Sequence, residues 1–218
     1  MNSRTGPPPR EAFTPRERAI IRGLRTPGQV QRFLHALPYN QEKKGETLRS
    51  FREVVRRGTA HCLEAALAAA VILEQHRYPP LVLSFDSQDN LDHVIFVFRH
   101  GRRWGSVARS RDAGLHGRKP VFRSIRDLAW SYFDPYVDMT GRLSGYQLVD
   151  LRDLGDYDWR FNRKNMWKVE KFLIDIPHRK MPSSDDRYRR LHARYTAYRK
   201  RDPTGPVVEI YQRRDRWM

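Results

Sequence analysis

The chain has 218 residues, 39% of them hydrophobic, which is enough to bury one sizeable core. No apolar run approaches the ~20 residues that a membrane span needs, and the first thirty residues lack the apolar stretch of a signal peptide, so we expect a cytoplasmic protein. The single cysteine excludes an internal disulfide and a zinc site built on paired cysteines.

Basic residues dominate the charge, with 42 Lys and Arg against 25 Asp and Glu and a formal net charge of +17. They are spread along the chain rather than gathered in one island, which is typical of solvated arginine-rich faces. The excess still favours encounter with polyanions, so non-specific contact with nucleic acid remains open.

Helix signals come first in the chain. Thr14 and Thr26 each precede a proline, and Glu17 stands at capping-box spacing from the first of them, so two short helices are predicted there. A third helix follows a polar loop and ends at Gly58.

The stretch 59–76 predicts a central helix, because its leucines, valine and alanines cover a broad apolar face that must be buried. If Thr59 or His61 caps this helix, Cys62 lies in its first turn, where free backbone N–H groups and the positive end of the dipole favour a thiolate. Glu64 is interpreted as an ordinary first-turn acid, with a polar group lining the site as the alternative.

Strand signals follow at 81–85, 93–98 and 103–110, separated by a polar loop and a glycine turn. Beyond Pro120 the pattern predicts three helices and two short strands, at 125–136, 162–176, 183–201, 144–149 and 206–212. Helices followed by a hairpin-bearing sheet predict an α+β fold rather than alternating βαβ units.

A reactive thiol needs a base, and position selects among the eight histidines. His61 is adjacent to Cys62, but on a helix it would project in a different direction. His93 begins a strand and shares a face with Ile95 and Val97. Which face meets the helix is open; if this one does, the imidazole borders the thiol. The remaining candidates have no visible route to it: His35, His76, His116, His178 and His192.

The run "REVVRRGTAHCLEAALAAAVILEQHRYPPLVLSF", followed by "DHVIFVFRHGRRWGSV", resembles the bacterial-type transglutaminase-like branch of the papain-like cysteine enzymes over about residues 50–108. In that family a nucleophilic cysteine opens a helix, a catalytic histidine starts a strand and a tryptophan follows on the next strand. Cys62, His93 and Trp104 fall on those positions. The resemblance implies a cysteine-bearing helix packed on a small antiparallel sheet, with extra helices at both ends.

Residues 1–12 are rich in proline and arginine and have little to bury, so we expect them to form a flexible leader. We expect one transglutaminase-like domain at 13–218, with its core at about 48–112 and a helical extension at about 120–218. The implied activity is attack on an amide or peptide bond of a protein or peptide substrate, by hydrolysis, deamidation or acyl transfer, with no cofactor and no metal. Trp104 is interpreted as a core residue, with a substrate platform as the alternative.

The third catalytic group is the point of departure from the family, whose members place an aspartate on the strand after the histidine. A turn centred on "HG" would set Ala108 opposite His93, with Ser106 and Ser110 as same-face neighbours and Asp112 two residues further. Three alternatives stay open: a dyad oriented by a hydroxyl or a backbone carbonyl, Asp112 folding back, or loss of catalysis. A non-catalytic basic module that binds polyanions or a protein partner is the competing hypothesis.

Overall fold

The computed structural model describes residues 6–43, 45–89, 92–137 and 141–204. Within these ranges the chain is α+β, as predicted. The α-helices are α1 Pro15–Gly23, α2 Pro27–Ala36, α3 Phe51–Arg57, α4 Cys62–Glu74, α5 Ile125–Tyr136, α6 Trp167–Asp175 and α7 Asp185–Arg201. The strands are β1 Leu81–Ser87, β2 His93–His100, β3 Arg103–Val107, β4 Arg118–Phe122, β5 Leu143–Asp150 and β6 Arg179–Lys180. Three short 3-10 helices complete the described chain: η1 Arg10–Ala12, η2 Ala113–Leu115 and η3 Leu151–Leu154.

The strands form one antiparallel sheet in the order β4-β3-β2-β1-β5-β6. β5, predicted as a strand far along the chain, pairs with the central β1 from Leu81 opposite Asp150 onward. β4 was not predicted, because Pro120 lies within it and proline disfavours strand interiors; the sheet accepts it on an edge strand. The strand predicted at 206–212 lies outside the described residues.

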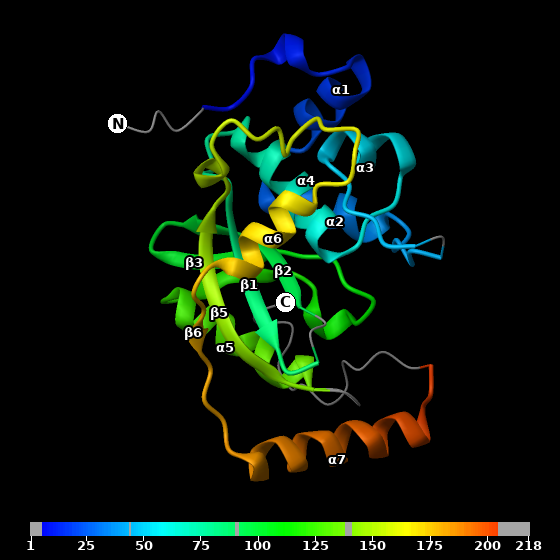
Figure 1. The fold of residues 1–218 in the computed structure, drawn as a ribbon, viewed down its shortest axis with the longest axis vertical. Helices are drawn as coiled ribbons and strands as arrows, with labels where there is room; N and C mark the ends of the chain where they lie inside the picture. Colours follow the sequence, from blue (N-terminus) through cyan, green and yellow to red (C-terminus); the bar gives the residue numbers. More distant parts are fainter. Residues whose placement is uncertain (1–5, 44, 90–91, 138–140, 205–218) are drawn as a thin grey trace.

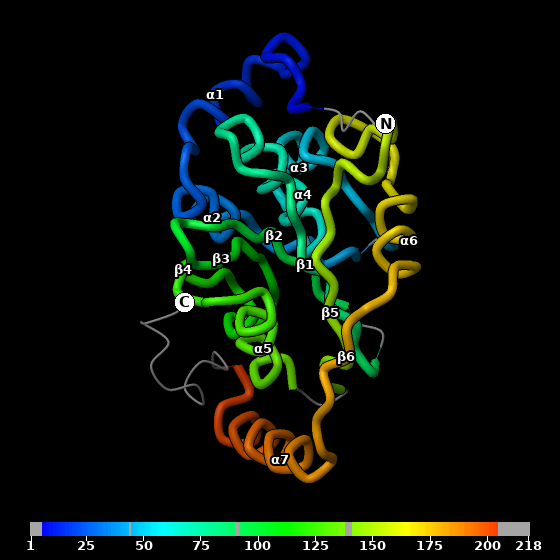
Figure 2. The backbone as a smooth tube through the Cα atoms, turned by 90° about the vertical axis from the view of Figure 1, so that its left-hand side faces the viewer, coloured from blue at the N-terminus to red at the C-terminus, as the bar shows by residue number. Residues whose placement is uncertain are grey.

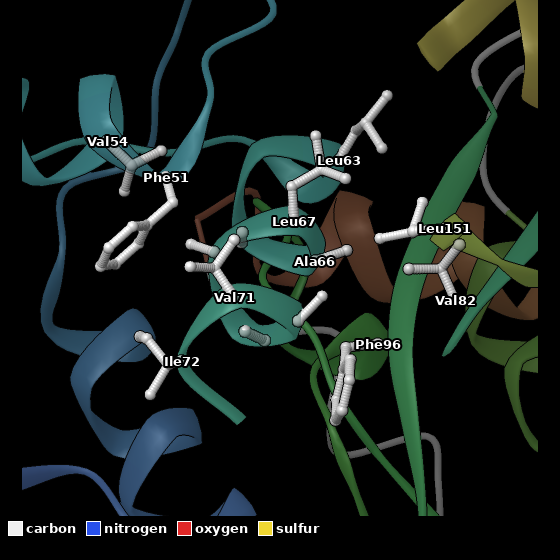
Figure 3. Packing of buried hydrophobic residues seen from close by; sticks show 14 of the residues in the cluster. Phe51, Val54, Leu63, Ala66, Leu67, Val71, Ile72, Val82, Phe96 and Leu151 are labelled. Carbon is white, nitrogen blue, oxygen red and sulfur yellow. The ribbon is translucent and has the colours of Figure 1, made fainter. Parts of the chain in front are cut away.

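Helix α4 packs on one face of the sheet and is almost wholly buried, as its alanine-rich sequence predicts. Figure 3 shows Ala66 of α4 facing Val82 and Phe96 on the strands, while Phe51 of α3 approaches the helix from the other side. The opposite face of the sheet packs against α5. The sheet therefore lies between two helical layers, with the cysteine-bearing helix in the middle of the larger core.

The predicted helix starts are confirmed at atomic detail. Thr14 Oγ1 accepts from the N–H of Glu17, and the Glu17 carboxylate accepts from the N–H of Thr14. Thr26 caps α2 in the same way, with Gln29 as its partner. Gly58 ends α3 with φ of 69°, a left-handed conformation that glycine adopts without strain.

The β2–β3 register differs by two residues from the prediction. Val97 pairs with Ser106, where the sequence-based register set Trp104 opposite it. The reason is the turn: Gly101 takes φ of 57° as the first central residue of a two-residue hairpin, so His100 is still paired. The prediction that Ala108 lies opposite His93 is therefore wrong.

The two ends of the described chain lie at opposite ends of the molecule. η1 and α1 lie at one end and α7 at the other in both views (Figures 1 and 2). Two ion pairs hold the start of α7 against the rest of the structure. Arg142 pairs with Asp185 of α7 at 2.6 Å. Arg187 of α7 pairs with Asp134 of α5 at 2.5 Å. None of the described helices combines the length and the apolarity needed to cross a bilayer.

Candidate active site

Cys62 is the first residue of α4 and lies half-buried in the wall of a cavity of about 640 Å³. The segment before it is held by backbone pairing: the Asn40 N–H donates to the Ala60 carbonyl, and Tyr39 forms an isolated parallel bridge with Ala60. The cap of α4 is His61, one of the two residues predicted for it. The thiol is thus placed at a helix N-terminus that opens into a cavity.

His93 begins β2 and is 3% exposed. Its Nε2–H donates to the carbonyl oxygen of Leu115 at 3.2 Å, and the ring lines the same cavity as Cys62. The ring stacks near Phe85 at 6.2 Å and Tyr132 at 5.9 Å between centroids. The structure therefore places the thiol and the strand histidine in the wall of one cavity.

The sequence left open which face of strand β2 packs against helix α4. Val94 and Phe96 face α4, whereas Ile95 and Val97, on the same face as His93, pack in the cluster around α5. His93, the first residue of its strand, nevertheless lines the same cavity as Cys62, the first residue of α4.

The electrostatic setting of the thiol favours its anion. Burial by itself would raise the pKa of the Cys62 thiol, but hydrogen bonds from His61 and His93, together with their charges, outweigh burial and hold the pKa well below its usual value. An ionised thiol is the nucleophilic form of cysteine.

His61 was set aside on sequence grounds, and the structure corrects this. Its backbone is extended, with φ of −92° and ψ of −174°, so its side chain does not follow the helical path that the prediction assumed. Nε2 donates to the Thr47 carbonyl oxygen at 2.9 Å. Burial lowers the pKa of His61, but the hydrogen bond to Cys62 and the nearby Cys62 and Glu64 charges raise it to about 9.

Tyr39 was also missed by the sequence analysis. It lines the cavity together with Cys62. Burial, followed by the charge of Cys62, raises the pKa of Tyr39. The guanidinium groups of Arg109 and Arg111 lie 5.6 and 5.9 Å from the centre of its ring. No sequence motif identifies this tyrosine, because its position depends on the bridge that its loop forms with Ala60.

The group that orients His93 is a backbone carbonyl, one of the alternatives left open above. Leu115 ends the short helix η2, and Asp112 caps that helix with Oδ1 accepting from the Gly114 N–H at 2.8 Å. Arg118 holds the same turn by donating to the Gly114 carbonyl at 2.6 Å. Asp112 therefore affects His93 indirectly, because it caps the short helix η2 whose last residue, Leu115, supplies the carbonyl group.

The other predicted site residues divide between cavity and core. Ser110 and Asp112 line the cavity with Cys62 and His93. Ser106 lies on β3 with Oγ 2.7 Å from the Tyr132 hydroxyl, away from the cavity wall. Trp104 is on β3 beneath the Arg99 guanidinium, 5.4 Å from the ring centre, and also lies apart from the cavity.

Glu64 lies behind the thiol as a fully buried carboxylate. It accepts from the backbone N–H of His61 at 3.0 Å and of Arg49 at 3.0 Å. The side chains of Asn40 and Thr47 donate to it as well. This network ties the loop before α3 to the start of α4, so Glu64 supports the site rather than lining it.

The rest of the cavity wall combines apolar and charged residues. It includes the acidic residues and arginines Glu42, Glu46, Asp92, Glu170, Arg111 and Arg199. Burial and the neighbouring carboxylates raise the pKa of Glu170. No group of three or more His, Cys, Asp or Glu in the described part of the chain is arranged to hold a metal ion.

Comparison with known proteins gives distant structural likeness alone. No protein-family model matches the chain, and no curated protein matches it. Among solved structures, EGTA-treated LapG from Legionella pneumophila aligns with a TM-score of 0.38 and 13% sequence identity. The alignment covers 68% of this chain and 89% of the LapG chain. A second LapG structure from the same organism aligns with a TM-score of 0.37 and 13% identity, over 67% and 84%.

Proposed function

We propose that the chain is a transglutaminase-like cysteine enzyme that cleaves or transfers at an amide or peptide bond through Cys62 and His93. The observation that carries the proposal is that the Cys62 thiol and the His93 imidazole line one cavity, with one nitrogen of the imidazole fixed by the Leu115 carbonyl. That is the arrangement of a nucleophile, a base and a group that orients the base.

The chemistry follows from these contacts. The Cys62 thiolate attacks the carbonyl carbon, the S–C bond forms and the carbonyl oxygen becomes an oxyanion. His93, protonated, gives its proton to the leaving amine as the C–N bond breaks, which leaves a thioester on Cys62. His93 then takes a proton from water or from an acceptor amine, whose attack forms the new C–O or C–N bond and releases the thiolate.

Tyr39 lines the cavity together with Cys62, so a substrate oxygen bound there would have the backbone N–H of Cys62 and the phenolic O–H of Tyr39 as candidate donors. Preorganised donors of this kind stabilise the tetrahedral intermediate. Tyr39 therefore has the role of second oxyanion donor in this proposal.

An activated ester tests the proposal without a known substrate. With p-nitrophenyl acetate, the protein should release a burst of p-nitrophenol and carry an acetyl group on Cys62, detected by intact mass and peptide mapping. Cys62→Ala should abolish both, and His93→Ala should reduce acylation by about 10² or more. Acylation that is unchanged in His93→Ala would refute the pair as the reactive unit.

A second candidate function rests on α7. This 17-residue helix carries seven Arg and Lys against two Asp, and much of it is exposed. Such a helix favours polyanion binding that weakens steeply with salt. Fluorescence anisotropy with a labelled single-stranded RNA at low salt tests this. Binding lost on Arg190→Glu with Arg194→Glu would favour it, and no binding at low salt would remove it.

A further inference from the structure

One face of helix α6 carries two large apolar side chains that are exposed beside the cavity. Among the described residues, the exposed large apolar side chains are Val121, Trp167 and Ile174, and the last two belong to α6. Trp167 and Ile174 are 41% and 59% exposed, and both line the cavity that holds Cys62. They lie on one side of the helix with Glu170 between them, because residues three and four apart are neighbours on a helix. Apolar side chains that gather in this way beside a cavity are typical of a binding surface.

Hydrogen bonds place the start of α6 close to the nucleophile. The N–H of Met166, the residue before the helix, donates to the Leu48 carbonyl oxygen at 2.9 Å. The preceding carbonyl oxygen, that of Thr47, accepts from Nε2 of His61 at 2.9 Å. His61 in turn directly precedes Cys62. The exposed face of α6 is therefore held by one loop to the residue before the thiol.

This face carries a negative charge in a strongly basic chain. Glu170 and Glu46 are exposed and line the cavity, and the described residues offer neither carboxylate an ion pair or a hydrogen bond. The lysines of α6 do not line the cavity. Lys171 pairs with Asp175 at 2.9 Å, and Lys168 lies over a tyrosine ring of the preceding loop, 5.3 Å from its centre. The cavity side of α6 is therefore acidic and apolar.

Most of the other charged groups of the cavity wall already have a partner. Glu42 and Asp92 each accept a hydrogen bond from a backbone N–H. Arg199 donates to the hydroxyl of a tyrosine on its own helix, α7, and the Arg111 guanidinium lies 5.9 Å from the centre of the Tyr39 ring. A cation that enters the cavity therefore finds an unengaged carboxylate on the α6 face.

We propose that Trp167, Glu170 and Ile174 form the subsite for a lysine or arginine side chain of the substrate, close to the amide under attack. The inference rests on the proposed function and adds the class of peptide that the enzyme accepts. One long basic side chain matches all three contacts, because its aliphatic stem packs on apolar surface while its charged head stays exposed. The head pairs with the carboxylate of Glu170 and lies over the indole of Trp167.

The net charge of the protein makes this preference a local property. With a formal charge of +17, the protein as a whole repels a cationic peptide. A preference for lysine over a neutral side chain of similar length must therefore come from carboxylates at the binding site, and it opposes the long-range field.

Peptide binding to the Cys62→Ala protein tests the subsite without turnover. Fluorescence anisotropy compares two end-blocked pentapeptides with a neutral fluorophore, one with lysine between alanines and one with norleucine in its place. The lysine peptide should bind about fivefold or more tightly, the combined effect of an ion pair and a cation–π contact. Glu170→Gln should reduce this preference to within about twofold. Asp175→Asn on the same helix, outside the cavity wall, is the matched control and should leave the preference unchanged.

Equal binding of the two peptides, no binding of either, or a preference that survives Glu170→Gln would overturn the subsite. A dimer that becomes monomeric in Trp167→Ala with Ile174→Ala, with no peptide bound, would assign the face to a second copy of the chain and overturn it as well. The proposed function is decided separately, because p-nitrophenyl acetate carries no side chain for the subsite. Acylation of wild-type Cys62 without a lysine preference refutes the subsite alone. A lysine preference without acylation refutes the enzyme and keeps the subsite as a binding site.

Discussion

At the scale of single residues, the site depends on groups that act through one another. Cys62 has its direct partners in His61 and His93, but the position of His61 depends in turn on Glu64, which accepts from its backbone N–H. Glu64 is fully buried, and its carboxylate also accepts from the backbone N–H of Arg49. Several hydrogen-bond donors therefore offset the cost of burying this carboxylate. Such a group is stable only while its donors stay in place.

Glu64→Ala should therefore destabilise the protein by about 3 kcal/mol or more, since it leaves several buried donors without an acceptor. Urea unfolding followed by circular dichroism measures this, with Glu170→Ala as the matched control. Glu170 is exposed on the cavity wall, so its loss should change stability by less than about 0.5 kcal/mol. Equal, small effects of both variants would show that the Glu64 network contributes little.

At the scale of elements, the short helix η2 positions the group that contacts His93. The Leu115 carbonyl orients His93, and Asp112 caps the turn that presents it. A neutral carbonyl fixes the orientation of the imidazole without adding a negative charge beside it.

Asp112→Ala should loosen η2 and slow the alkylation of Cys62 at about pH 6 by about two- to tenfold, through a less well placed His93. Asp112→Asn retains an Oδ1 acceptor for the Gly114 N–H and should stay within about twofold of the wild type. If the two variants lose reactivity equally, the aspartate charge matters and the capping role is wrong.

Elements also show what the sequence could predict. Cys62 and His93 were identified because an alanine-rich helix and an alternating strand carry strong periodic signals. His61 was rejected by a rule for helical residues, which fails at a cap with extended backbone. Leu115 could not be found, because a carbonyl leaves no trace in side-chain chemistry and its place depends on a hairpin register set by φ of 57° at Gly101.

At the scale of the whole molecule, the core around the candidate site is not continuous in the chain. The site residues fall between 39 and 115, but the central strand β1 has β5 as one neighbour and β2 as the other. Val82 and Leu83 therefore complete their pairing only with residues 143–150. The region around the cysteine relies on a strand that the sequence placed in a C-terminal extension.

A fragment of residues 1–122 should accordingly fail to fold cooperatively, because β1 would become a long apolar edge. A fragment of residues 1–181 retains β5 and β6 and should unfold in one transition. Thermal unfolding by circular dichroism compares them. A cooperative transition in the shorter fragment would mean that β5 is dispensable for the core.

The central claim is that two imidazoles keep the thiol of Cys62 ionised. It is tested most directly by titrating the ultraviolet absorbance of the thiolate in the wild type against Cys62→Ser. Because the folded-state pKa is lowered, the thiolate signal should persist as the pH falls well below the usual thiol value of about 8.5, and disappear only in acid. A single midpoint near about 8.5 would contradict the account.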